Sequence, residues 1–127
     1  MTHTAAILSI GDELLAGAHP DLNAPVLAKT LRDHGVHTGE VHVVGDDEEP
    51  LAKLFAECAA RHDVVISSGG LGPTLDDVTR HAFARAAGVE LELDRAVVEH
   101  LRGWFAERGR EMPSTNERQA LFPAGTR

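Results

Sequence analysis

The chain has 127 residues, of which 12 are basic and 20 acidic, so its formal net charge is −8 with histidine neutral. This length predicts one domain with a buried core, and the acidic balance excludes a surface whose field attracts nucleic acid. The single cysteine excludes an internal disulfide, and no apolar run approaches the roughly 20 residues that span a bilayer, so we expect a cytoplasmic protein without membrane or nucleic-acid partners.

The first part of the chain alternates between strand and helix patterns. Residues 5–10 form a short apolar run that ends at Gly11 and predicts a buried strand. A loop follows, and a helix is expected from about Asp21 to His34, with Asp21 as its cap. Residues 36–44 are then expected to form the second strand.

The apolar positions of these two elements predict how they face the core. In the helix, Val26, Leu27 and Leu31 recur at helical spacing and form its apolar stripe. In the following strand, Val41 and Val43 share one face because strand side chains alternate with a period of two.

A second helix and a third strand follow. The acidic first turn at 46–50 is typical of a helix start. The buried stripe of this helix is expected to comprise Leu51, Leu54, Phe55 and Cys58. Residues 63–68 are β-branched and apolar on both faces, which indicates a central, parallel strand.

The rest of the chain continues the alternation. A glycine loop covers 69–75, a helix is expected over 76–87, and residues 89–93 read as a half-exposed strand. Asp94 is expected to cap a further helix that Gly109 ends, and a short helical piece closes the pattern. This order predicts an α/β fold of three layers, α/β/α, with a mostly parallel sheet.

The loop after the third predicted strand carries the strongest chemical signal. It reads Ser67-Ser68-Gly69-Gly70-Leu71-Gly72-Pro73-Thr74 and leads into a helix. Glycines let backbone amides approach a ligand, and a helix start adds free N–H groups and a partial positive charge. The pattern therefore predicts an anion cradle suited to phosphate. The alternative is a tight turn that needs glycine only for packing.

Carboxylates follow each of the first three predicted strands, whose carboxyl ends lie at the same edge of a parallel sheet. Asp12 comes after the first, Asp46 after the second and Asp77 after the glycine loop, while Asp76 is expected to cap the next helix. Asn23 lies on the first turn of a helix that faces the same edge. The three aspartates beside a glycine cradle predict a metal-plus-phosphate site, with solvated loop acids as the alternative.

The ordered motifs identify a family. They are Gly11-Asp12-Glu13-Leu14-Leu15-Ala16-Gly17, Asn23-Ala24, Val44-Gly45-Asp46, Gly69-Gly70-Leu71-Gly72-Pro73-Thr74-Leu75-Asp76-Asp77-Val78-Thr79 and Asn116-Glu117-Arg118-Gln119-Ala120. Together they closely resemble the N-terminal domain of the competence/damage-inducible CinA proteins. That domain belongs to the molybdopterin-binding superfamily with the MoaB/Mog fold.

The resemblance implies roles for individual residues. Asp46 and Asp77 would be catalytic, and Asp12, Asp46 and Asp77 would hold a divalent metal such as Mg²⁺, Mn²⁺ or Co²⁺. The residues that would bind the phosphorylated ligand are Gly11, Asn23, Ser68, Gly69, Gly70, Gly72 and Thr74. The implied activity is metal-dependent hydrolysis of the pyrophosphate in ADP-ribose, and molybdopterin is the other implied ligand.

Three functions stay open at this point. The domain is a pyrophosphate hydrolase, a non-catalytic module that binds molybdopterin or another phosphorylated ligand, or an assembly domain with a vestigial site. The superfamily suggests a homodimer or homotrimer. In the family, the segment at 116–120 leads to a glycine-rich stretch, a further strand and a Pro-Gly-Pro-Pro turn, so we expect domain 1–127 to lack its final strand and turn.

Overall fold

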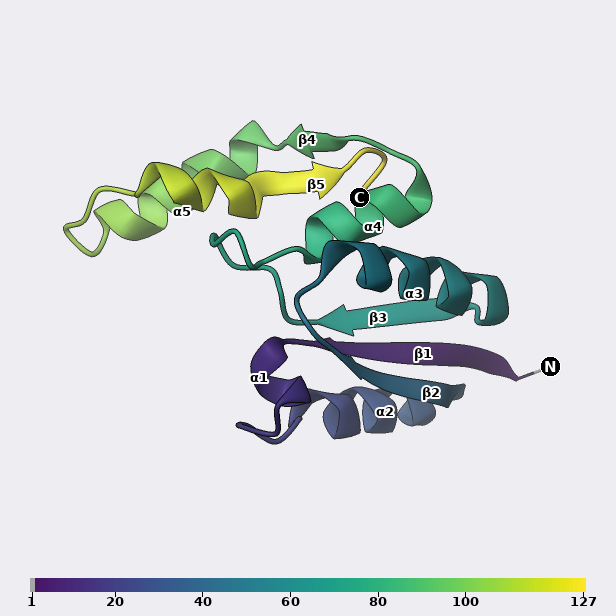
Figure 1. The fold of residues 1–127 in the computed structure, drawn as a ribbon. Coiled ribbons are helices and arrows are strands. Elements are labelled where there is room, and N and C mark those ends of the chain that lie inside the picture. The colour runs from purple at the N-terminus through teal and green to yellow at the C-terminus, as the bar shows by residue number, and fades with distance from the viewer. Residues whose placement is uncertain (1) are drawn as a thin grey trace.

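A parallel sheet forms the centre of the computed structural model, which describes residues 2–127 (Figure 1). Its strands are β1 (His3–Ile10), β2 (Val36–Val44) and β3 (Val64–Ser68), in the order β2-β1-β3. The expected parallel sheet is confirmed. The expectation that 63–68 is central is wrong, because β1 occupies the centre of this sheet and Val64 on β3 is exposed. Apolar residues on both faces of a strand do not determine its place in the strand order.

Helices cover both faces of the sheet (Figure 1). α2 (Asn23–Asp33) packs on one face, and α3 (Glu48–Arg61) and α4 (Thr79–Ala87) pack on the other. The three-layer α/β/α architecture is therefore confirmed. The first loop, expected to be irregular, contains a short helix, α1 (Asp12–Leu15).

The core lies between β1 and α3. Side chains of Ala6, Leu8 and Ile10 on β1 pack against the apolar stripe of α3. The stripe is confirmed: Leu51, Phe55 and Cys58 are buried, and Leu54 packs partly buried beside them. Burying one such large side chain stabilises the fold by about 1.5–3 kcal/mol.

The α2 stripe is less complete than its pattern predicts. Leu27 and Leu31 are half-buried, whereas Val26 is exposed. The pyrrolidine of Pro25 fits the first turn of a helix, where no N–H partner is needed. Gly35, with a φ of 78°, follows the helix as expected.

A bulge in β2 decides which side chains face the core. The partner of β1 jumps from Thr38 to Glu40 between two neighbouring β1 residues, so Gly39 is an extra residue. An extra residue turns every later side chain to the opposite face. Val41 and Val43 do share a face, as predicted, but that face is half-exposed, and Glu40 turns toward α3 instead.

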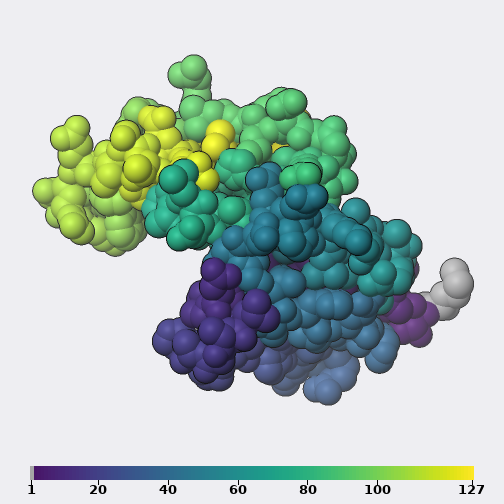
Figure 2. All heavy atoms as spheres, in the orientation of Figure 1, coloured from purple at the N-terminus to yellow at the C-terminus, as the bar shows by residue number. Residues whose placement is uncertain are grey.

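The chain after α4 forms a smaller unit beside the sheet (Figures 1 and 2). It contains β4 (Leu91–Leu93), α5 (Arg95–Ala106), the 3-10 helix η1 (Ser114–Ala120) and β5 (Leu121–Pro123). The Asp94 cap of α5 is confirmed, since its carboxylate accepts the N–H groups of the second and third residues that follow at 2.9 and 3.1 Å.

β5 was not expected from the sequence, and it pairs antiparallel with β4. Three-residue strands carry too few positions for a readable alternation. Within residues 2–127, no helix has the length and apolar character needed to cross a membrane.

Candidate functional site

The carboxyl ends of the three parallel strands meet at one edge of the sheet. Gly11 follows β1, Asp46 follows β2 after one intervening residue, and the glycine loop follows β3. The N–H of Gly11 donates to the carbonyl of Val44 at 2.9 Å, which joins the first two loops. Figure 1 shows α1 and the loop after β3 on the same side of the molecule. This is where open α/β sheets bind ligands.

Two glycines give the loop its path. Gly69 and Gly70 have φ values of 97° and 67°, in the left-handed region that favours glycine. A Cβ on Gly69 would overlap the carbonyl oxygen of Ile10, and one on Gly70 would overlap the hydroxyl of Thr79. Packing against β1 and α4 therefore requires glycine at both positions.

The carbonyl groups of residues 69–72 are held by the start of α4. The Thr79 hydroxyl donates to the Gly69 carbonyl at 2.7 Å, and the Thr79 N–H donates to the Gly70 carbonyl at 3.2 Å. The guanidinium of Arg80 donates to the carbonyls of the next two residues at 2.6 and 2.8 Å. In a planar trans peptide the N–H points opposite to its carbonyl, so the loop turns N–H groups away from α4.

Arg80 is a site residue that the sequence reasoning missed. Its side chain is buried, with 5 % of the residue exposed. Burial, with Arg118 nearby, lowers the pKa of Arg80, while Asp77 opposes this. The signal that would have found it is a single arginine on the helix turn directly after a glycine loop, where backbone carbonyls need donors.

Asp77 follows the glycine loop and accepts two hydrogen bonds from Thr74. Its Oδ2 accepts from the Thr74 N–H at 2.9 Å and from the Thr74 hydroxyl at 2.8 Å. Burial raises the pKa of Asp77, but the hydrogen bonds from Thr74 and from the Gly72 amide outweigh it, so the pKa is lowered. Gly72 and Thr74 were predicted to donate to a phosphate, but their N–H and hydroxyl groups donate to the carboxylate of Asp77 instead.

The start of α4 differs from its predicted start. The helix begins at Thr79 after Val78, and no side chain caps it, so the prediction of a helix from 76 capped by Asp76 is wrong. The Asp77 carboxylate prefers the N–H and hydroxyl of Thr74, which lie before the helix. This competing turn delays the helix by three residues.

Two reciprocal hydrogen bonds between Asp12 and Asp46 connect the first two loops. The Asp12 N–H donates to Asp46 Oδ2 at 3.1 Å, and the Asp46 N–H donates to Asp12 Oδ1 at 2.8 Å. Burial raises the pKa of Asp46, and the negative charges of Asp12, Glu13 and Asp77 raise it further. The three predicted aspartates therefore share one electrostatic neighbourhood.

Asn23 and Ser68 join the helix α2 to this edge. The Asn23 Nδ2 donates to Ser68 Oγ at 2.7 Å. The expected cap of α2 is confirmed, because Asp21 Oδ1 accepts the N–H groups of Asn23 and Ala24, both at 3.1 Å. The side chains of Asn23 and Ser68, both predicted to bind the ligand, thus lie next to the glycine loop and are hydrogen-bonded to each other.

Whether the three aspartates bind a divalent cation stays a prediction. Within the part of the chain that the structure describes, their oxygens do not form a set of three within 4.8 Å of one another. Mg²⁺ is commonly held by one or two carboxylates together with phosphate oxygens. The raised pKa of Asp46 marks negative charge that such a cation would neutralise.

Known proteins share this sequence and architecture. A family model described as "Probable molybdopterin binding domain" matches residues 6–126. A CinA-like protein of Geobacter metallireducens is 51% identical over 119 residues, covering 94% of this chain and 29% of that protein. A CinA-like protein of Syntrophomonas wolfei is 44% identical over 121 residues, covering 95% and 29%. The chain therefore spans about three tenths of the length of these relatives.

Solved structures show the same fold. The crystal structure of the protein CinA from Thermoplasma acidophilum has a TM-score of 0.89 at 29% identity, covering 98% of this chain and 73% of that one. The molybdopterin biosynthesis enzyme MoaB from Thermus thermophilus has a TM-score of 0.62 at 20% identity, covering 89% and 69%. The second likeness supports the fold alone.

Proposed function

Because the chain belongs to the family of probable molybdopterin binding domains, we propose that its glycine loop binds the phosphate of a phosphorylated pterin or nucleotide. One observation carries the proposal: Thr79 and Arg80 hold the four successive carbonyls of residues 69–72. The N–H groups of Gly70 and Leu71 are thereby turned toward the open side of the loop, which is an arrangement that binds anions. Pro73 has no N–H, and the Gly72 N–H donates to Asp77. Arg80 adds a positive charge on the carbonyl side of the loop, opposite to the proposed phosphate position.

We propose further that the site hydrolyses a nucleotide pyrophosphate of the ADP-ribose type. A divalent cation at Asp12, Asp46 and Asp77 would polarise the phosphoryl group and activate water. Burial and acidic neighbours raise the pKa of Asp46, and such a cation would stabilise its ionised carboxylate. Asp77 is kept in place by Thr74, so its carboxylate is oriented before a ligand arrives.

A non-catalytic binding module is the second candidate, and the position of Asp77 favours it. The carboxylate of Asp77 takes both donors of Thr74. A phosphate bound there must displace this carboxylate or bind beside it, at the N–H groups of Gly70 and Leu71. In that case a pterin phosphate would bind without turnover, as a molybdopterin-binding module does.

Calorimetry and product analysis separate these functions. ADP-ribose and molybdopterin are titrated into the chain with Mg²⁺, Mn²⁺, Co²⁺ or EDTA, and AMP formation is followed. Hydrolysis predicts AMP that requires metal and is lost in Asp77→Asn. A binding module predicts affinity that survives EDTA, without AMP.

The control variant is Gly88→Ala, since Gly88 has a φ of 66° but open space around its Cβ position. Gly70→Ala, which meets the Thr79 hydroxyl, should lose ligand binding while Gly88→Ala keeps it. Failure of every phosphorylated ligand to bind, with a stable dimer or trimer by light scattering, would overturn both functions in favour of an assembly domain.

A further inference from the structure

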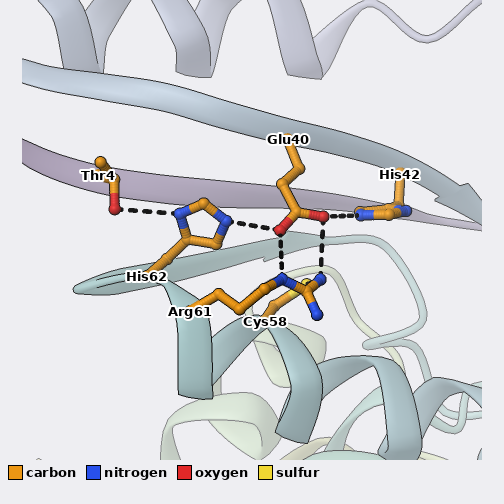
Figure 3. A network of polar contacts seen from close by, with 6 residues as sticks. All are labelled: Thr4, Glu40, His42, Cys58, Arg61 and His62. Carbon is orange, nitrogen blue, oxygen red and sulfur yellow. Dashed lines mark hydrogen bonds and ion pairs between the residues drawn. The ribbon is translucent and has the colours of Figure 1, made fainter.

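A second cluster of chemically active side chains lies away from the glycine loop (Figure 3). Glu40 on β2 is its centre, and His42, Arg61 and His62 all hydrogen-bond to its carboxylate. The sole cysteine, Cys58, lies beneath them on α3 and is fully buried. The bulge at Gly39 creates this cluster, because it turns Glu40 and His42 toward α3.

Three of these side chains have the geometry of a metal site. The donor atoms of Glu40, His42 and Cys58 all lie within 4.8 Å of one another. In a tetrahedral zinc site, bond lengths of about 2.0–2.3 Å place the ligand atoms roughly 3.3–3.8 Å apart. Small side-chain rotations therefore bring a thiolate, an imidazole and a carboxylate onto one ion.

We propose that Glu40, His42 and Cys58 bind a Zn²⁺-class transition-metal ion in exchange for the guanidinium of Arg61. Sulfur and imidazole donors favour Zn²⁺, Co²⁺ or Ni²⁺ over Mg²⁺ or Ca²⁺. Three protein ligands leave a fourth position open to solvent. This site is independent of the function proposed for the glycine loop.

The guanidinium of Arg61 occupies the position proposed for the metal ion. Its Nε and Nη2 donate to the two Glu40 oxygens at 2.9 and 3.1 Å, and Nη2 lies 4.0 Å from Cys58 Sγ. The Arg61 side chain is 49% exposed at the end of α3, so it can leave toward solvent. One cation therefore replaces another at the same carboxylate.

The charge balance of this exchange is even. With Arg61 in place, one carboxylate faces one guanidinium and the Cys58 thiol is neutral, because burial raises the pKa of that thiol. With the metal bound, a carboxylate and a thiolate face a divalent ion. Cys58 releases one proton to the buffer, and Arg61 moves into water with its charge.

His62 is a positioning residue in this arrangement. Its Nε2 lies 2.6 Å from Glu40 Oε1, and its Nδ1 lies 3.1 Å from Thr4 Oγ1, so it is anchored at both ends. The His62 side chain is 10% exposed, and a Cβ on Gly39 would overlap its ring. Metal-ligating carboxylates are commonly oriented by such a second hydrogen bond.

Cobalt spectroscopy tests the proposal directly. Co²⁺ is titrated into the reduced full chain, and the near-ultraviolet thiolate-to-cobalt charge-transfer band is recorded. Since Cys58 is the only cysteine in the sequence, this band reports its coordination alone, whatever the aspartates of the glycine loop bind. We expect a saturable band that equimolar Zn²⁺ removes.

Variants then distinguish the ligands from bystanders. Cys58→Ser should lose the band, and His42→Gln should weaken Co²⁺ binding at least about tenfold while it keeps the thiol. Arg61→Gln should tighten binding severalfold, because the competing guanidinium is gone. His37→Ala, an exposed histidine of the same strand, is the matched control and should change nothing.

Three outcomes would overturn the proposal: no charge-transfer band at saturating Co²⁺, a band that His42→Gln leaves unchanged, or weaker binding in Arg61→Gln. If Cys58→Ser does not fold, the His42 and Arg61 variants still decide the question, because both keep the buried thiol.

Discussion

The two ends of the parallel sheet hold their polar groups by different means. At the carboxyl end, the glycine loop is shaped by backbone carbonyls bound to Thr79 and Arg80. Toward the amino end, the cluster around Glu40 is held by side chains alone. A loop held through its backbone tolerates few substitutions, whereas a side-chain cluster can rearrange its partners. The following predictions test this contrast, beginning with the largest effect.

Replacing Gly70 should do the greatest damage. Gly70→Val forces a β-branched residue to a φ of 67° and into the Thr79 hydroxyl. We expect a loss of about 2–4 kcal/mol in the free energy of unfolding, measured with urea. The control Gly88→Ala has a similar φ in open space and should lose only about 1 kcal/mol. Equal losses in both variants would show that packing against Thr79 contributes nothing.

Removing the guanidinium that pins the loop should come next. Arg80→Met leaves the carbonyls of Leu71 and Gly72 without their donors, which costs about 1–3 kcal/mol in the free energy of unfolding. Affinity for ADP-ribose should fall with it, because the loop N–H groups are no longer held in one direction. Arg85→Met, on the last turn of the same helix, is the control. Unchanged affinity in Arg80→Met would contradict the pinning role.

The cluster at the other end should show its contribution through pH. Arg61 first, then His42 and His62, hold the pKa of Glu40 far below its ordinary value of 4.5. A lowered folded pKa adds stability above the ordinary pKa, and this stability is lost as the pH falls below it. Urea unfolding should therefore find wild type more stable than Glu40→Gln by a constant margin from pH 7 to about 5, shrinking at lower pH. A margin that grows on acidification would refute the assignment.

The smallest effect should have the opposite sign. Burial and three acidic neighbours raise the pKa of Asp46, so its ionised form is unfavourable in the folded state. Asp46→Asn should stabilise the chain at pH 7 by less than about 1 kcal/mol, and the gain should vanish as the pH falls and Asp46 protonates. The same variant should abolish metal-dependent hydrolysis. A destabilised variant with full activity would contradict both statements.

Sequence reasoning predicted the glycine-loop end well because its information is local. Two successive glycines, Gly69 and Gly70, indicate a positive φ. The family motif that contains Asp77 placed this residue next to the glycine loop. The acids that follow separate strands lie at one edge because parallel strands end together. Whether they hold a metal stays a prediction.

The other end was not predictable in the same way. Gly39, an isolated glycine inside the strand pattern of 36–44, is a weak signal of a bulge that the sequence reasoning did not use. Which face the later side chains take depends on pairing with the partner strand. Arg80 was missed because its partners are backbone carbonyls, and an arginine directly after a glycine loop was not considered as their donor. The edge position of β3 likewise depends on the order in which strands pair, not on their composition.

The bulge at Gly39 has a consequence for how such a cluster could arise or disappear. Removing that one residue would place Glu40 directly after Thr38 and leave it opposite Ala6, so the faces of the strand beyond the bulge would stay as they are. If Gly39 instead paired with Ala6 and no residue were lost, every later side chain would change face. Val41 and Val43 would then meet α3, while Glu40 and His42 would turn toward the face that α2 covers. A one-residue slip in strand pairing, with no change in the sequence, can thus convert a polar cluster into an apolar interface. Loss of residue 39 in a related chain should accordingly leave this cluster in place.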